Sequence, residues 1–414
     1  MGLGPSIKMT TLHHYHCPIT KQLLKDKELD FSGIIVNGVS ESFDDKVFTA
    51  QRTGDIAGCM RADGAIVAID GWGNHHIDFV NVIEQLGMKG IPSIGMSYIG
   101  QQGRLVCTNN YVETIVDFNK NASGYESCIV GDNNLSAYDA IKAVALLKSK
   151  MKKMGNFRKD LAAEEKRVMR LIRKNYAIEE IRFGEKTDIS HGILTIRGGI
   201  EEGFVGLEPS VKEMHVRLIK PNEHHQFINS NLDFMPIAYK QSGNLGAGET
   251  RLLAGATVML TGVEDVSGFQ PSNIGSSEGY MDHCIRFNQS GTPAEDDSIL
   301  HMDFLFENGE GRTATGIQAA HRLADHVLNE IRKQMHNIED MPYATDEFYD
   351  VIRPNCSRVV LVKIVSGLGN MYDTAVFPNQ PGGYIGARNL IDMRNTPFVI
   401  TPNQCLDGVI HSLI

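Results

Sequence analysis

The chain has 414 residues, of which 42% are hydrophobic and 22% charged, and its formal net charge is −10. This length allows two or three domains with cores of their own, and the composition is typical of globular proteins. The negative net charge argues against a protein that binds nucleic acid through a basic surface. The lack of an apolar run of 18 residues predicts that the chain has no membrane span. The seven Cys form no CxxC pair, which indicates reduced thiols and no structural zinc site. We therefore expect a cytoplasmic protein that binds neither nucleic acid nor membranes nor a metal ion.

Residues 1–150 alternate between strand and helix patterns. Short apolar runs predict buried strands, and apolar residues spaced three and four apart predict helices. The predicted strands are 33–37, 65–70, 91–96 and 111–118, and the predicted helices are 47–61, 77–86 and 135–154. Continuous apolar strands joined by helices favour a parallel sheet covered on both faces. We therefore expect an α/β fold in which residues 1–150 form a flavodoxin-like, three-layer domain.

Residues 151–176 are rich in Lys, Arg and Glu, and we expect them to form a charged linker helix. Its cationic cluster, from Lys166 to Lys174, is either a solvated helix face or a docking strip for an acidic partner.

Residues 177–414 have a different pattern, which predicts a larger, mixed α+β domain. A hairpin is expected over 181–196 and a helix over 317–335. Further strands are predicted at 214–219, 251–261, 301–306, 358–365 and 398–401.

The first candidate site follows the predicted strand 65–70. Asp70, Trp72 and Asn74 alternate there with two Gly, which allow the backbone to turn sharply. Ligands of open parallel sheets lie beyond the carboxyl ends of the strands, so this loop is a candidate pocket rim. The alternative is a loop that is merely anchored by its buried Trp.

A His-rich segment, 13–16, lies near the start of the chain. Adjacent His side chains diverge, and Pro18 argues against a helix that would align His13 with His16. We therefore do not expect a metal site here.

A second polar loop contains Glu278 between small residues. Its carboxylate is either an inward-facing general base or ammonium partner, or an exposed group in a turn. Cys405, in the polar tail, is a weak candidate for a catalytic thiol.

Three motifs resemble the D-proline reductase proprotein family and, more loosely, glycine reductase component B. They read Gly-Pro-Ser-x-Lys-x-Thr-Thr-x-His-His at 4–14, Gly-Ser-Ser-Glu-Gly-Tyr at 275–280 and Thr-Pro-Asn-x-x-Leu-Asp-Gly at 401–408. Residues 1–150 resemble the half that follows the family's self-cleavage point, and residues 176–412 resemble the half that precedes it. The two halves therefore stand in swapped order, and the resemblance implies that the two ends of the chain lie close together.

In that family the Cys at the cleavage point becomes a pyruvoyl group, which captures the substrate amine, and a selenocysteine of another subunit attacks the α carbon. Here Met1 and Gly2 occupy the place of that Cys, and the chain contains no selenocysteine. The resemblance thus implies a protein without cofactors and without a pyruvoyl group, which is not catalytic alone.

The resemblance implies partners and a site as well. The partners are D-proline reductase subunits or a second copy of this chain, and the ligand is a small amino acid. Four segments should converge on one cleft, with the candidate residues Thr10, Thr11, His13, His14, Asp70, Trp72, Asn74, Ser276, Ser277, Glu278, Tyr280, Thr401 and Asn403. The favoured function is an accessory, assembly or regulatory component of a proline reductase system. The alternatives are a reductase subunit that uses a partner's pyruvoyl group or selenocysteine, and a small amino-acid sensor.

Overall fold

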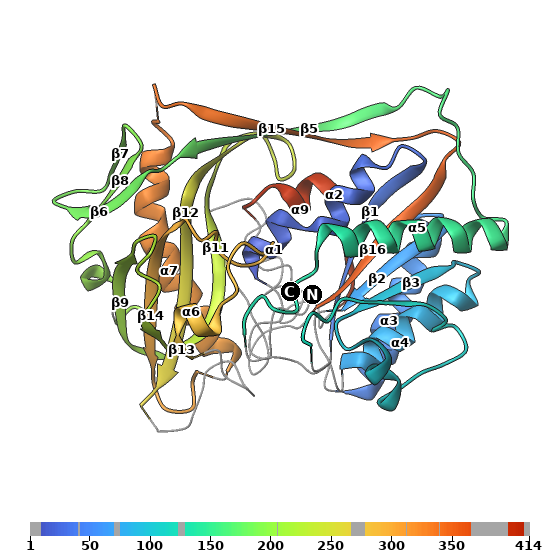
Figure 1. The fold of residues 1–414 in the computed structure, drawn as a ribbon, viewed down its shortest axis with the longest axis horizontal. Coiled ribbons are helices and arrows are strands. Elements are labelled where there is room, and N and C mark those ends of the chain that lie inside the picture. Colours follow the sequence, from blue (N-terminus) through green and yellow to red (C-terminus); the bar gives the residue numbers. More distant parts are fainter. Residues whose placement is uncertain are drawn as a thin grey trace.

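The computed structural model describes residues 10–39, 42–69, 75–122, 129–204, 206–265, 278–311, 313–338, 340–365 and 396–409. They form two lobes, each built on a six-stranded sheet, and a pair of long strands crosses between the lobes (Figure 1). The α/β class predicted from the sequence is confirmed. No helix in the described ranges is long and apolar enough to cross a membrane.

The sheet of the first lobe has the strand order β17-β1-β16-β2-β3-β4. Its strands are β1 (Leu29–Gly38), β2 (Gly64–Ile69), β3 (Ser93–Ser97), β4 (Ile115–Asp117), β16 (Ser357–Val365) and β17 (Phe398–Ile400). Strands β1, β16, β2, β3 and β4 run parallel, and β17 pairs antiparallel with β1 at the edge. Strands β1, β2, β3 and β16 are buried almost throughout, which is the pattern of a parallel sheet covered on both faces.

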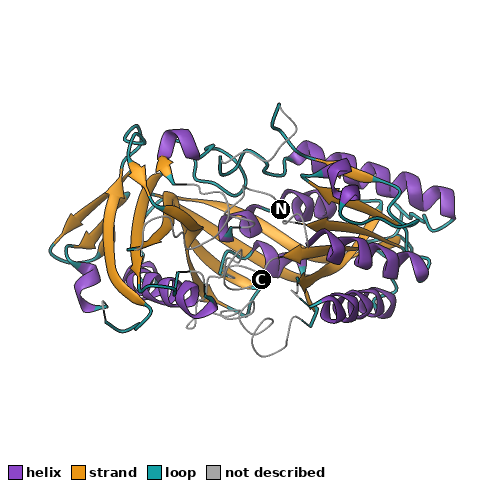
Figure 2. Cartoon of the chain, turned by 90° about the horizontal axis from the view of Figure 1, so that it is seen from below, coloured by secondary structure: helices purple, strands orange, loops and turns teal. Residues whose placement is uncertain are grey.

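Helices cover both faces of this sheet, as Figure 2 shows. Helices α3 (Phe43–Cys59) and α4 (His75–Met88) pack on one face, and α2 (Pro18–Lys25) and α5 (Ala137–Met154) pack on the other. Ser136 caps α5 in a reciprocal pair with Asp139, and Gly155 ends the helix with a φ of 75°. The predicted three-layer arrangement is therefore present.

This sheet does not respect the domain boundary that was predicted at residue 150, because it contains strands from both sides of it. Strands β16 and β17 were expected in the second domain, yet β16 lies between β1 and β2 and β17 forms the edge. An apolar run indicates that a strand is buried, but it carries no information about the strand with which it pairs. The first lobe therefore combines strands from the first 120 residues with strands from residues 357–400.

The second lobe is built on a sheet with the order β15-β5-β12-β14-β9, and β11 pairs with β12 as well. Its strands are β5 (Lys166–Ala177), β9 (Val211–Ile219), β11 (Ser230–Ser242), β12 (Gly248–Glu264), β14 (Ser298–Phe306) and β15 (Tyr343–Ile352). Helix α7 (Ala314–Met335) supplies much of the apolar core of this lobe. Smaller elements are β6 (Glu180–Gly184), β7 (Asp188–Ser190), β8 (Ile193–Arg197), β10 (Phe227–Ile228), β13 (Gly279–Tyr280), α6 (Met281–Cys284), η1 (Gly100–Leu105) and η2 (Ile200–Gly203).

The predicted linker helix over 151–176 is wrong. Helix α5 ends at Met154, and the cationic cluster lies on strand β5, which pairs antiparallel with β15 along the top of Figure 1. The charges follow a strand pattern because they meet partners on β15: Arg170 pairs with Glu347, and Arg167 lies over the ring of Tyr349. Such cross-strand pairs stabilise a sheet in the way that i, i+4 pairs stabilise a helix. A run of charged residues alone therefore does not distinguish a solvated helix from a strand with charged cross-strand pairs.

Candidate functional site

Helix α1 (Thr11–His16) lies between the two lobes, where it contacts β11 and α9 (Pro402–Leu406) (Figure 1). The side chain of Thr10 caps the helix by accepting a hydrogen bond from the backbone N–H of His13. The helix ends at Cys17 because Pro18 restricts the residue before it to extended conformations, and Pro18 begins α2. The sequence argument that Pro18 disfavours a helix over residues 13–16 was therefore wrong.

The start of α1 is fixed to the second lobe by buried hydrogen bonds. Thr11 donates twice to the carboxylate of Asp233 on β11, from its backbone N–H at 3.0 Å and from its hydroxyl at 2.7 Å. The hydroxyl of Thr10 donates to the carbonyl of Gly291 at 2.8 Å. Bonds to a buried carboxylate are strong, so Thr11 in particular holds the helix in place.

His13 and His14 are buried in the interior of the molecule. Nδ1 of His13 lies 3.1 Å from Oδ1 of Asn134 and 3.0 Å from the hydroxyl of Ser290. Burial, with a smaller contribution from Lys363, holds the pKa of both imidazoles well below the ordinary value, so both are neutral at neutral pH. Nε2 of His13 and the side chain of Asn133 have no hydrogen-bond partner in the described part of the chain.

Asn403 lies in α9, which packs against α1, and Thr401 immediately precedes this helix. Thr401 caps α9 in a reciprocal pair with Gln404. The backbone N–H of Asn403 donates a hydrogen bond to the carboxylate of Asp350 at 2.9 Å. Its side-chain amide donates to the carbonyls of Met169 and Gly246, both at 3.2 Å. The segments around Thr10 and Asn403 therefore meet, and Asn403 fixes α9 to the strands of the second lobe.

The other candidate residues lie elsewhere or outside the described part of the chain. Tyr280 is half exposed, and its ring stacks on His225 at the surface, with ring centroids 4.3 Å apart. Glu278 is half-buried just before β13. The candidates that lie outside the described residues are Asp70, Trp72, Asn74, Ser276 and Ser277.

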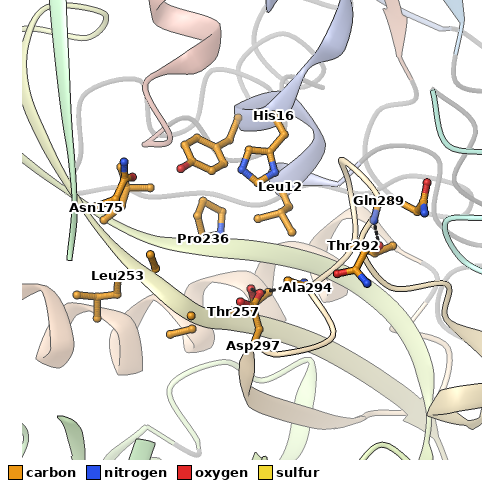
Figure 3. Close-up of a pocket in the computed structure, with 16 residues that line it drawn as sticks. Leu12, His16, Asn175, Pro236, Leu253, Thr257, Gln289, Thr292, Ala294 and Asp297 are labelled. Atoms are coloured by element: carbon orange, nitrogen blue, oxygen red, sulfur yellow. Dashed lines mark hydrogen bonds between the residues drawn. The ribbon is translucent and has the colours of Figure 1, made fainter. Parts of the chain in front are cut away.

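A cavity of about 400 Å³ lies beside α1 on the second lobe (Figure 3). Its walls include His16 on one side and Asp297 on the other, and Asn175 on β5 contributes an amide group. The carboxylate of Asp297 accepts hydrogen bonds from the hydroxyl of Thr257 at 2.5 Å and the backbone N–H of Ala294 at 3.1 Å. Burial raises the pKa of Asp297, and burial lowers the pKa of His16 to about 3, so the imidazole is neutral at neutral pH.

A second cavity, of about 630 Å³, adjoins the first, because Tyr15, His16, Asn175 and Ala254 line both. Arg173 is buried in its wall between the rings of Tyr15 and Phe348, which lie 4.2 and 4.6 Å from the guanidinium carbon.

The guanidinium of Arg173 donates to Asp346 and to the carbonyl of Leu406, both at 2.8 Å. Lys21 of α2 also lines the second cavity, and its ammonium group forms no ion pair within the described ranges. Burial, followed by the charge of Arg173, lowers the pKa of Lys21. This cavity therefore has a partly buried cation that is available to a ligand.

The sequence analysis did not identify Lys21, Asp297 or Asn175. They come from α2, from the turn before β14 and from β5, which lie far apart in the chain. None of them belongs to a recognisable sequence motif. Only the folded arrangement brings them to the same pair of cavities.

Comparison with known proteins places this chain in a family. The family model of the glycine/sarcosine/betaine reductase component B subunits matches residues 3–123 and 169–412. The D-proline reductase proprotein PrdA of Acetoanaerobium sticklandii is 34% identical over 254 residues, which is 61% of this chain and 40% of that protein. The glycine reductase complex component B subunits alpha and beta of the same organism are 23% identical over 262 residues, which is 59% of this chain and 56% of that protein.

The betaine reductase complex component B subunit alpha of Peptoclostridium acidaminophilum is 28% identical over 270 residues, which is 59% of this chain and 55% of that protein. The chain thus spans about half the length of the curated relatives that it matches, or less. No solved structure matches it at a significant level. Because the family model matches most of its residues, the chain belongs to the family of glycine/sarcosine/betaine reductase component B subunits.

Proposed function

We propose that this chain is a non-catalytic, accessory component of an amino-acid reductase system and that it binds a small amino acid such as D-proline in the two cavities beside α1. Family membership supports the relation to a reductase system. The relatives from glycine and betaine reductase are named as components of complexes, so the partners proposed for this chain are reductase subunits or a second copy of itself.

The observation that carries the proposal is the opposite charge of the two adjoining cavities. Asp297 lines the first cavity and Lys21 lines the second, and both cavities share the polar side chains of His16 and Asn175. An amino acid has an ammonium and a carboxylate group on one small framework. The carboxylate of Asp297 is the complementary partner of the ligand's ammonium group, and the ammonium of Lys21 is the complementary partner of its carboxylate.

Binding of this kind is weak. Each charge-assisted hydrogen bond contributes about 1.5–3 kcal/mol, and part of that is lost in ordering the ligand. We expect a dissociation constant around the millimolar range, which corresponds to about 4 kcal/mol.

The side chains around the cavities favour binding over chemistry. No Cys among the described residues lines either cavity, and the neutral imidazole of His16 is a poor base because its pKa is about 3. The proposal includes the absence of a pyruvoyl group on this chain. Treatment with phenylhydrazine should therefore leave its intact mass unchanged.

Calorimetric titration with D-proline tests the site. The changes Asp297→Asn and Lys21→Met should each weaken binding by about tenfold or more, because the loss of about 1.4 kcal/mol is a factor of ten. The neighbouring exposed residues Asp296 and Lys27 provide matched controls. Asp296→Asn and Lys27→Met should bind like the unaltered chain.

Three results would contradict the proposal. They are undetectable binding by the unaltered chain, equal losses in the variants and their controls, and turnover of D-proline by the purified chain alone. The same assay with reductase subunits, with and without this chain, measures the accessory role directly.

A further inference from the structure

Two imidazoles and a carboxylate gather on the surface of the second lobe. They belong to His225, Asp282 and His283, which are all exposed, and one donor atom from each lies within 4.8 Å of the other two. Nδ1 of His225 lies 3.1 Å from a carboxylate oxygen of Asp282, and the rings of His225 and His283 meet edge to face with centroids 5.9 Å apart. None of the three lines either cavity beside α1, so this cluster is separate from the site proposed above.

Main-chain hydrogen bonds bring the three side chains together. His225 lies just before β10, and the other two residues belong to α6, which follows β13 (Figure 1). Strands β10 and β13 pair antiparallel. The backbone N–H of Met281 donates to the carbonyl of Gln226 at 2.9 Å, and that of Asp282 donates to the carbonyl of His224 at 3.2 Å. Both neighbours of His225 in the chain are therefore bonded to the start of α6, which fixes the cluster from the backbone.

An aromatic ring orients the two imidazoles. Tyr280 stacks on His225 with ring centroids 4.3 Å apart and planes only 5° from parallel, and it meets His283 edge to face at 6.1 Å. On its other contact, the ring of Phe227 meets Tyr280 edge to face at 6.1 Å. Side chains that are already held in place lose less conformational entropy when they bind a ligand. The donor groups are therefore preorganised although they face solvent.

The spacing of the donor atoms suits a first-row transition metal ion. Zn²⁺ binds His nitrogens and carboxylate oxygens at about 2.0–2.2 Å in tetrahedral geometry, which places two ligand atoms about 3.3–3.5 Å apart. The 3.1 Å between His225 and Asp282 is close to that separation. Imidazole ligands suit Zn²⁺ and its neighbours in the first row, whereas Mg²⁺ and Ca²⁺ take oxygen ligands.

We propose that His225, Asp282 and His283 bind a Zn²⁺ ion and leave a fourth coordination position open to water. The inference does not depend on the amino-acid ligand proposed above. The absence of a metal ion was expected from the Cys spacing and from residues 13–16, whereas these three residues form no local motif. The bound ion links the segment before β10 to α6 and thereby fixes β13, which Glu278 immediately precedes.

Calorimetric titration of the untagged chain with Zn²⁺ tests this inference. Loss of an outer-shell partner costs about 10–100-fold in metal affinity, so His225→Ala and His283→Ala, which remove ligands, should each weaken binding by at least about tenfold. The matched control is His215→Ala. The side chains of His215 and His225 are both 66% exposed, and His215 lies 3.3 Å from a single carboxylate, that of Glu213. This control should bind Zn²⁺ like the unaltered chain, because a pair without a third ligand is not a site.

Amide hydrogen exchange locates the ion. Zn²⁺ should slow exchange in residues 224–228 and 279–284 of the unaltered chain but not of His283→Ala, because the ion links these two segments. Mg²⁺ should leave the exchange of both segments unchanged. Circular dichroism confirms that each variant is folded. The inference would be overturned by undetectable Zn²⁺ binding, by equal losses in His283→Ala and His215→Ala, or by protection that is confined to other segments or is equally strong with Mg²⁺.

Discussion

Asp407 shows how a single buried charge connects α9 to the second lobe. Its carboxylate is fully buried and accepts hydrogen bonds from Lys240 at 2.7 Å, from the backbone N–H of Gly246 at 2.6 Å and from the hydroxyl of Thr250. A buried ion pair adds little net stability compared with apolar side chains, but the loss of one partner leaves the other charge uncompensated. Replacement of Asp407 alone should therefore be costly.

We expect Asp407→Asn to lower the free energy of unfolding by about 3–5 kcal/mol, measured in urea by circular dichroism. The control is Asp265→Asn, which breaks the ion pair of Asp265 with Lys212 at the surface. Exposed pairs contribute about 0–1 kcal/mol. Similar losses in the two variants would show that the Asp407 network is solvated.

At the scale of elements, local signals decide where α5 begins. The hydroxyl of Ser136 accepts a hydrogen bond from the backbone N–H of Asp139, and the carboxylate of Asp139 accepts one from the backbone N–H of Ser136. Ser136→Ala should lower the free energy of unfolding by about 0.5–2 kcal/mol, because it removes this cap.

The matched control is Ser149→Ala, on the exposed side of the same helix. Ala is the better helix former there, so the control should be neutral or slightly stabilising. Denaturant unfolding measures both variants, and a loss in the control as large as in Ser136→Ala would contradict a role for the cap.

At the scale of the whole molecule, the two lobes share structure that should make them unfold together. Helix α1 is bonded to β11, and the β5–β15 pair crosses between the lobes (Figure 1). Val362 is buried in the central strand β16, whereas Val399 is half exposed on the edge strand β17.

We expect Val362→Asp to accelerate amide hydrogen exchange in β2 and in β12 of the other lobe, because a buried unpaired charge destabilises the first lobe strongly. Val399→Asp, at the exposed edge, should change neither region appreciably. Faster exchange confined to β2 would show that the lobes open independently.

The scale of each feature explains how far the sequence could predict it. Strands β1, β2 and β3 were predicted because each is a local apolar run with its own boundaries. The position of β16 and the strand character of β5 depend on partners that lie far away in the chain, which local patterns do not specify. Lys21 and Asp297 were not identified for the same reason: each is an ordinary charged residue until the fold brings it to a cavity that His16 also lines.

The position of β16 has a consequence for synthesis of the protein on the ribosome. Strand β1 has no direct pairing with β2, because β16 fills the place between them. The nascent chain therefore carries two unsatisfied, apolar strand edges until residues 70–356 have been translated, which takes roughly 15–60 s at about 5–20 residues per second. Unpaired edges of this kind invite pairing with other chains. Expression at lower temperature or with more chaperone should accordingly raise the soluble yield of this protein more than that of a protein whose sheet closes from consecutive strands.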